Sequence, residues 1–160
     1  MIYFIKISIG DTHLLQPEDA VRHFSLKRHA LLDFHSSVSD KKEDKYFLAN
    51  EHSDKISLTR IRTSLEKLLP RVILSVDKNS NFESYRVRLC LASFIIFVLL
   101  LFSTLQGLYN VISEHYFDSD TFEVMAMLVA FILLTFIEIK LTKRKLMQAI
   151  ARFALPVQAD

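Results

Sequence analysis

The chain has 160 residues, a formal net charge of +2, 51% hydrophobic residues, two glycines and one cysteine. One cysteine excludes an internal disulfide, and two isolated glycines, Gly10 and Gly107, exclude a glycine-rich loop that would cradle a phosphate. Two long apolar stretches towards the C-terminus leave about 80 residues for a soluble part, which is enough for one small domain and too few for two.

Residues 1–79 predict a small cytoplasmic α+β head. Apolar and polar residues alternate early in this region, which is typical of a strand, and Pro17 followed by two acids fits the first turn of a helix. Later, leucines recur at helical spacing and stop at Pro70. The expected elements in chain order are strand 2–9, helix 17–34, a loop over 36–45, strand 46–49, helix 57–69 and strand 72–76.

The two apolar stretches predict a transmembrane helical hairpin. Residues 89–113 carry no formal charge, and a helix of that length can cross a hydrocarbon core of about 30 Å. Ser80 and Glu83 fit a capping box, so we expect the first transmembrane helix to cover 80–113. The second covers 121–140, with Glu123 and Glu138 at the membrane boundaries and an acidic external link, 114–120, between the spans.

Charge predicts the orientation of this hairpin. All 20 lysines and arginines lie outside 89–139, whereas the link region carries acids and no lysine or arginine. By the positive-inside rule, both termini face the cytoplasm. The cations expected to set this topology and to anchor the chain to lipid are Arg86, Arg88, Lys140, Lys143, Arg144 and Lys145.

Small residues suggest how the two spans meet. Ser103 and Gly107 are four residues apart, as are Ala126 and Ala130, and such strips let helix backbones approach closely. Because Gly107 and Ala126 lie at similar depth, we expect the strips to face each other. Alternatively, they face another copy of the chain or another membrane protein.

Glu138 is the one acid close to the cytoplasmic end of the second span, at about the level of Arg88. A charge at that depth prefers a partner, so an interfacial ion pair between Arg88 and Glu138 is expected. The favoured interpretation is an interfacial acid that reaches water. The alternative is a carboxylate on an ion or proton pathway.

The basic tail, 141–160, is expected to form a short amphipathic helix. Leu146, Ile150 and Phe153 recur on one side, opposite several cations. This helix would lie on the inner leaflet or pack on the head. A plain stop-transfer flank explains the tail equally well.

The sequence motifs assign no catalytic residue, cofactor or metal site. There is no HExxH motif, paired-cysteine spacing or serine nucleophile elbow. His29 and Asp33 have the spacing of a metal pair, but two ligands do not make a site. The basic clusters lack interleaved aromatic residues, so nucleic-acid binding is not predicted either.

The length and layout, with spans 89–113 and 121–140 between basic flanks, resemble those of the phage superinfection-exclusion proteins. That resemblance covers the whole chain but carries no motif from which functional residues could be transferred. It implies a prophage-encoded, non-enzymatic protein that keeps incoming phage DNA from crossing the inner membrane, with phage ejection proteins or a host inner-membrane protein as partners. Two other functions fit the same layout: a small oligomeric pore in abortive defence, and an immunity protein against a pore-forming toxin.

Overall fold

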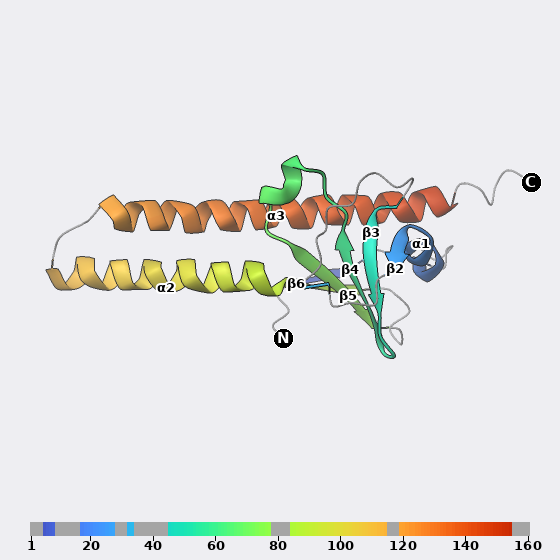
Figure 1. Ribbon diagram of the computed structural model, residues 1–160, viewed down its shortest axis with the longest axis horizontal. Coiled ribbons are helices and arrows are strands. Elements are labelled where there is room, and N and C mark those ends of the chain that lie inside the picture. The colour runs from blue at the N-terminus through green and yellow to red at the C-terminus, as the bar shows by residue number, and fades with distance from the viewer. Residues whose placement is uncertain are drawn as a thin grey trace, which may run out of the picture.

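The computed structural model describes residues 5–8, 17–27, 32–33, 45–77, 84–114 and 119–154. Among these residues, a six-stranded mixed sheet forms the head, and two long helices run side by side away from it (Figure 1). The elements are β1 (Ile5–Ser8), α1 (Pro17–His23), β2 (Ser25–Lys27), β3 (Phe47–Glu51), β4 (Lys55–Arg60), the 3-10 helix η1 (Leu65–Leu68), β5 (Val72–Asp77), β6 (Ser84–Leu89), α2 (Leu91–Glu114) and α3 (Ser119–Ala154). The strand order is β1-β6-β5-β4-β3-β2, antiparallel throughout except for the parallel pair β2 and β3.

The main core lies on one face of the sheet. The strand register places Ala49, Leu58, Leu74 and Val87 in a row across β3, β4, β5 and β6, so all four side chains point to the same face. Helix α1 and the last turns of α3 cover this face. Their buried apolar residues are Ala20, Val21, Leu146, Ala149 and Ile150.

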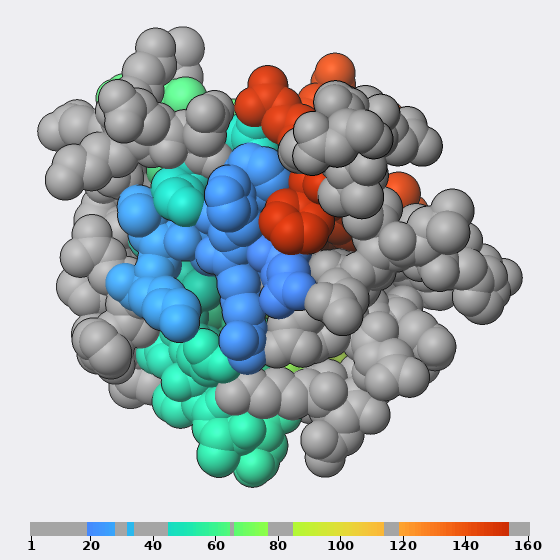
Figure 2. Space-filling model, turned by 90° about the vertical axis from the view of Figure 1, so that its right-hand side faces the viewer, coloured from blue at the N-terminus to red at the C-terminus, as the bar shows by residue number. Residues whose placement is uncertain are grey.

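At the end of the head, α1 and α3 pack against each other and together cover the sheet. The segment containing α1 and β2 lies against the C-terminal turns of α3, with β3 and β4 beside it (Figure 2). His23 contacts Phe153 with ring centroids 6.0 Å apart, and Tyr46 stacks on Phe24 at 5.3 Å. Lys145 lies over the Tyr46 ring at 5.1 Å from its centroid. Packing on the head, one of the alternatives for the basic tail, is therefore what the structure shows.

The strands predicted at 2–9, 46–49 and 72–76 correspond to β1, β3 and β5. Residues 2–4 and 9 of the first prediction lie outside the described residues, as does 36–44 of the predicted loop. The α+β class of the head and the helical hairpin after it are thus confirmed at the level of secondary structure.

Both helices predicted in the head are wrong in extent. The helix expected over 17–34 ends at His23, because the Phe24 carbonyl accepts bonds from Tyr46 N and Phe47 N, and β2 then pairs with β3. The helix expected over 57–69 is instead β4 followed by η1. In β4, buried Ser57 and Thr59 alternate with apolar residues, and a strand covered on both faces does not need an apolar residue at every position.

The first long helix starts later than expected. Residues of β6 pair with both β1 and β5, so the chain is a strand up to Leu89 and α2 begins at Leu91 rather than at Ser80. The proposed capping residues, Ser80 and Glu83, lie outside the described residues.

Helix α3 is also longer than expected. It continues without a break from Ser119 to Ala154, so residues 141–154 of the separate amphipathic helix predicted for 141–160 are instead the end of α3, and residues 155–160 lie outside the described residues. At about 1.5 Å per residue, 35 residues span about 50 Å, well beyond a hydrocarbon core of about 30 Å. The excess length is the part that packs on the sheet.

Candidate functional site

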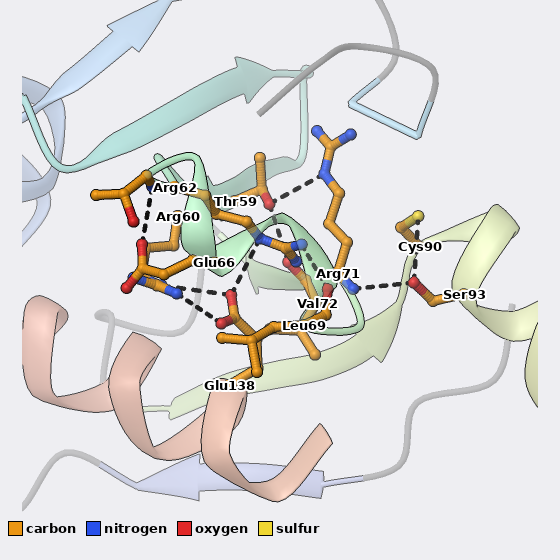
Figure 3. Close-up of polar contacts among 11 residues, drawn as sticks. Thr59, Arg60, Arg62, Glu66, Leu69, Arg71, Val72, Cys90, Ser93 and Glu138 are labelled. Atoms are coloured by element: carbon orange, nitrogen blue, oxygen red, sulfur yellow. Dashed lines mark hydrogen bonds and ion pairs between the residues drawn. The ribbon is translucent and has the colours of Figure 1, made fainter. Parts of the chain in front are cut away.

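The junction between the head and the two long helices contains a buried ion pair. Arg60 ends β4 on the core face of the sheet, and Glu138 projects towards it from α3 (Figure 3). Arg60 Nη2 donates to Glu138 Oε2 at 2.7 Å, and Arg60 Nε donates to Oε1 at 3.3 Å. The two side chains are only 3% and 1% exposed. A two-point contact of this kind fixes the orientation of both side chains.

Two further charged residues complete this group, which we call the Arg60–Glu138 cluster: Arg60, Arg62, Glu66 and Glu138. Glu66 of η1 accepts a bond from Arg60 Nη1 at 2.7 Å, and its other oxygen accepts one from Thr63 N at 2.9 Å. Arg62 Nε lies 3.5 Å from Glu138 Oε1, and Arg62 Nη1 donates to the Leu69 carbonyl at 2.6 Å. The cluster is balanced, with two cations and two anions.

The environment shifts the pKa values of the cluster without discharging its arginines. Burial alone would lower the pKa of Arg60, but its hydrogen bonds to Glu138 and Glu66 outweigh that penalty and raise the pKa. Burial lowers the pKa of Arg62. Arginine remains protonated throughout the physiological pH range, so Arg60 and Arg62 keep their charges and the cluster joins β4 to α3 as a clamp.

A second set of contacts joins the head to the start of α2. Arg71 N donates to Ser93 Oγ at 2.9 Å, and Cys90 N donates to the Arg71 carbonyl at 2.9 Å (Figure 3). Thr59 Oγ1 donates to the Val72 carbonyl at 3.0 Å and accepts from Arg71 Nε at 3.3 Å. The backbone of Arg71, just before β5, is therefore bonded to the Cys90 backbone and to the Ser93 hydroxyl in the first turn of α2.

Asp33 forms a third link. Its two oxygens accept bonds from Arg88 Nη1 and Nη2, each at 2.9 Å, and Oδ1 also accepts from Leu91 N at 2.9 Å. Leu91 is the first residue of α2, so a carboxylate that is distant in sequence caps this helix and stabilises its positive end. The hydrogen bonds from Arg88 lower the pKa of Asp33.

The predicted ion pair between Arg88 and Glu138 is wrong. Arg88 is paired with Asp33, and Glu138 with Arg60 and Arg62. Nor does Glu138 reach water as an interfacial acid, because it is enclosed between α3 and the head. The register of the sheet explains the difference, since Arg60 occupies the core face of β4 whereas Arg88 points to the opposite face from Val87.

The other predicted anchoring cations lie mostly at the surface. Arg86, Lys140, Lys143 and Arg144 are exposed, which is compatible with contact to lipid head groups. Lys145 is half-buried over Tyr46 and belongs to the packing of α3 on the head.

Of the four small residues predicted to join the two spans, the structure brings only Gly107 into the contact between α2 and α3. A Cβ added to Gly107 would lie 2.8 Å from Cγ2 of Thr121, so the glycine permits the close approach of α3. Ser103, Ala126 and Ala130 are exposed. The predicted pairing of the two strips is corrected accordingly. Larger residues fill the interface, as in the stacked pair Phe97 and Phe131 at 6.0 Å.

Replacing Gly107 with leucine is expected to push the outer ends of the helices apart. Overpacking of this kind costs about 1–3 kcal/mol, whereas Ala126→Leu, on an exposed face, should change stability by less than about 0.5 kcal/mol. Thermal unfolding in detergent measures both variants. Adding Thr121→Ala should recover part of the loss in Gly107→Leu, and equal melting temperatures for Gly107→Leu and Ala126→Leu would contradict this packing.

Helices α2 and α3 are long and apolar enough to cross a membrane. The core helix of a soluble protein would pass the same test, but it would be mostly buried. Here only 17% and 6% of the most apolar stretches of the two helices are buried. Exposed side chains such as Leu99, Phe102 and Leu133 form an apolar surface of a kind that marks a membrane or an interaction site. The hairpin therefore indicates membrane association.

An apolar cavity of about 160 Å³ lies where the hairpin meets the sheet. It is lined by Val72, Val87, Arg88, Leu89, Phe97, Phe131, Ile132, Thr135, Phe136 and Ile139. The two polar side chains among these are engaged elsewhere, because Thr135 Oγ1 donates to the Phe131 carbonyl and Arg88 is paired with Asp33.

Across the described residues, no group of three or more histidine, cysteine, aspartate or glutamate side chains could hold a metal ion. Comparisons with protein families, curated proteins and solved structures find no match for this chain.

Proposed function

We propose that the chain is a non-enzymatic protein of the bacterial inner membrane that acts by contact, and that its activity is superinfection exclusion, in which the entry of incoming phage DNA is blocked. The observation that carries the proposal is the clamp between Arg60 of the sheet and Glu138 of α3, two buried side chains joined at 2.7 Å. The orientation of a head clamped in this way is fixed relative to α3 and therefore relative to the membrane. The head would be held at the bilayer surface, where a translocation machine delivers DNA.

The distribution of charge supports a cytoplasmic head. Exposed Lys140 and Lys143 follow the apolar part of α3 on the side of the head, and exposed Asp120 and Glu123 lie at the opposite end. Cations are retained on the cytoplasmic side during insertion. In this orientation the head meets phage proteins and DNA only after they begin to cross the inner membrane.

The test is infection of cells that express the chain with a panel of phages. We expect reduced plating of particular phages with normal adsorption, no entry of their DNA and an intact membrane potential. Asp120→Asn changes an exposed residue at the outer end of α3 and serves as a control variant. Its amount in the membrane should equal that of the original chain. Unchanged plating of every phage, with the protein present in the membrane, would contradict superinfection exclusion.

One observation favours a second candidate. Ala126 and Ala130 lie on an exposed face of α3, which agrees with the alternative in which small residues contact another copy of the chain or another membrane protein. An oligomeric pore would then collapse the membrane potential upon expression or infection. An immunity protein would instead protect cells from a pore-forming toxin and leave phage plating unchanged.

A further inference from the structure

We propose that the cavity at the junction binds one acyl chain of an anionic phospholipid from the leaflet that faces the head. The inference rests on the membrane placement of the hairpin but not on superinfection exclusion. Its basis is the combination of an apolar cavity, an opening towards lipid, and two cations positioned above that opening.

The chemistry of the lining favours a hydrocarbon. Val72, Val87 and Leu89 of the sheet form one wall, and Phe97 and Phe131 form another. The lining surface is entirely apolar, so water entering the cavity would find no hydrogen-bond partner. An apolar cavity of similar size, about 150 Å³, stays dry and binds benzene, so a cavity of about 160 Å³ has room for a short section of an acyl chain.

The cavity opens on the lipid-facing side of the hairpin. Two of its lining residues on α3, Ile132 and Phe136, are 38% and 60% exposed, whereas the residues of the sheet wall are buried. A chain lying along Ile132 and Phe136 could therefore enter from the bilayer without any movement of the sheet. This continuity with the lipid-exposed surface distinguishes the cavity from a packing defect within the head.

Two lysines are placed to bind the head group of the same lipid. Lys140 and Lys143 follow Phe136 by four and seven residues, so they lie on its side of α3, one and two turns further along. Both lysines are exposed. The eight residues from Ile132 to Lys140 rise about 12 Å, less than the thickness of one leaflet's hydrocarbon, about 15 Å. One lipid can therefore reach the cavity with a chain and Lys140 with its phosphate.

A tryptophan reporter can test this site because the chain has no tryptophan of its own. Phe136→Trp puts the reporter at the cavity rim, and Ile137→Trp puts it one residue further along, about 100° around α3 and outside the cavity lining, where Ile137 is 48% exposed. Each variant is purified in detergent and titrated with phosphatidylglycerol or phosphatidylcholine carrying brominated acyl chains, which quench tryptophan fluorescence on contact.

The expected result is saturable quenching of the Phe136→Trp reporter at low mole fractions of brominated phosphatidylglycerol, with weaker quenching by phosphatidylcholine. The Ile137→Trp reporter should follow the bulk mole fraction and show no preference between head groups. In the Phe136→Trp background, Lys143→Gln should weaken phosphatidylglycerol binding about fivefold. Arg144→Gln removes the neighbouring exposed cation on another side of the helix and should leave binding unchanged.

Equal, non-saturable quenching of the two reporters would overturn the proposal, because it would show general contact with lipid and no site. So would equal affinity for a brominated free fatty acid, since the head group would then contribute nothing. If neither reporter is quenched, the membrane placement fails as well. Native mass spectrometry of the unsubstituted chain avoids any effect of the reporter, and it should detect one retained anionic phospholipid; a lipid-free spectrum in mild detergent would contradict the site.

Discussion

Replacing Glu138 with alanine is expected to destabilise the contact between the head and α3 by about 3–5 kcal/mol. The substitution removes the bidentate partner of Arg60 and leaves two guanidinium groups, those of Arg60 and Arg62, buried beside each other with only Glu66 to balance them. A buried charge that has lost its partner raises the free energy of the folded state strongly, because no interaction replaces the hydration that the charge lost on burial.

Cys90 provides a natural probe of this effect. It is the chain's one cysteine, it is 3% exposed, and it lies at the junction next to Ser93. Cys90 packs with Leu32, Leu48 and Ile73 on the sheet face opposite to α3, so it becomes accessible when the head unfolds, and when opening is fast the rate of maleimide labelling follows the population of that open state. A loss of 3–5 kcal/mol should therefore raise this rate between about a hundredfold and a few thousandfold.

The matched control is Glu123→Ala, which removes an exposed acid from the same helix and should leave the labelling rate within about twofold of the original. Combining Glu138→Leu with Arg60→Met should recover much of the lost stability, because apolar groups of similar volume can replace a buried ion pair. Equal labelling rates for Glu138→Ala and Glu123→Ala would show that the clamp does not hold the head.

Replacing Asp33 with asparagine is expected to destabilise the junction by about 3 kcal/mol at neutral pH. The carboxylate satisfies both outer nitrogens of Arg88, a side chain that is 10% exposed, and it also caps the first N–H group of α2. An amide retains the shape of the side chain but not its negative charge, so the buried Arg88 loses its counter-ion. Denaturant unfolding followed by circular dichroism measures the difference from the original chain.

The same pair predicts a dependence on pH. Because the hydrogen bonds from Arg88 lower the pKa of folded Asp33 below its ordinary value of about 3.9, this residue contributes its stabilisation fully above about pH 4. That contribution is lost as the pH falls through the lowered pKa. The stability difference between the original chain and Asp33→Asn should thus be constant from pH 7 to about pH 4.5 and shrink below pH 4. A difference that already shrinks between pH 7 and pH 5 would contradict the assignment to Asp33.

The hairpin could be predicted from sequence because its signal is local. Whether an uncharged apolar run can cross a bilayer depends on its own length and not on the rest of the fold. The strands β1, β3 and β5 were predictable for a similar reason, since short apolar runs bounded by turn residues indicate strands. Strand β6 was missed although Tyr85, Val87 and Leu89 alternate with Arg86 and Arg88, because a helix-start pattern precedes it and an apolar run follows it.

The Arg60–Glu138 cluster could not be predicted because its central pair is separated by 78 residues. Its members come from β4, the segment between β4 and η1, η1 itself and α3, and only the register of the sheet brings Arg60 to the face that α3 crosses. One signal was available: Arg60, Arg62 and Arg71 lie within or beside strongly apolar segments, where an arginine is rarely buried without a partner. Glu138, which the sequence pattern paired with Arg88, is the acid that Arg60 and Arg62 required.

The most direct test of the account is the accessibility of single introduced cysteines in intact cells. Asp120→Cys lies at the outer end of α3 and Lys27→Cys lies on the head, both at exposed positions, and the unsubstituted chain with its buried Cys90 gives the background. A membrane-impermeant maleimide should label Asp120→Cys in intact cells and Lys27→Cys only after lysis, with the protein in the membrane fraction. Labelling of Lys27→Cys in intact cells, protection of Asp120→Cys, or a chain that stays soluble without detergent would contradict a hairpin that crosses the membrane and carries its head on the cytoplasmic side.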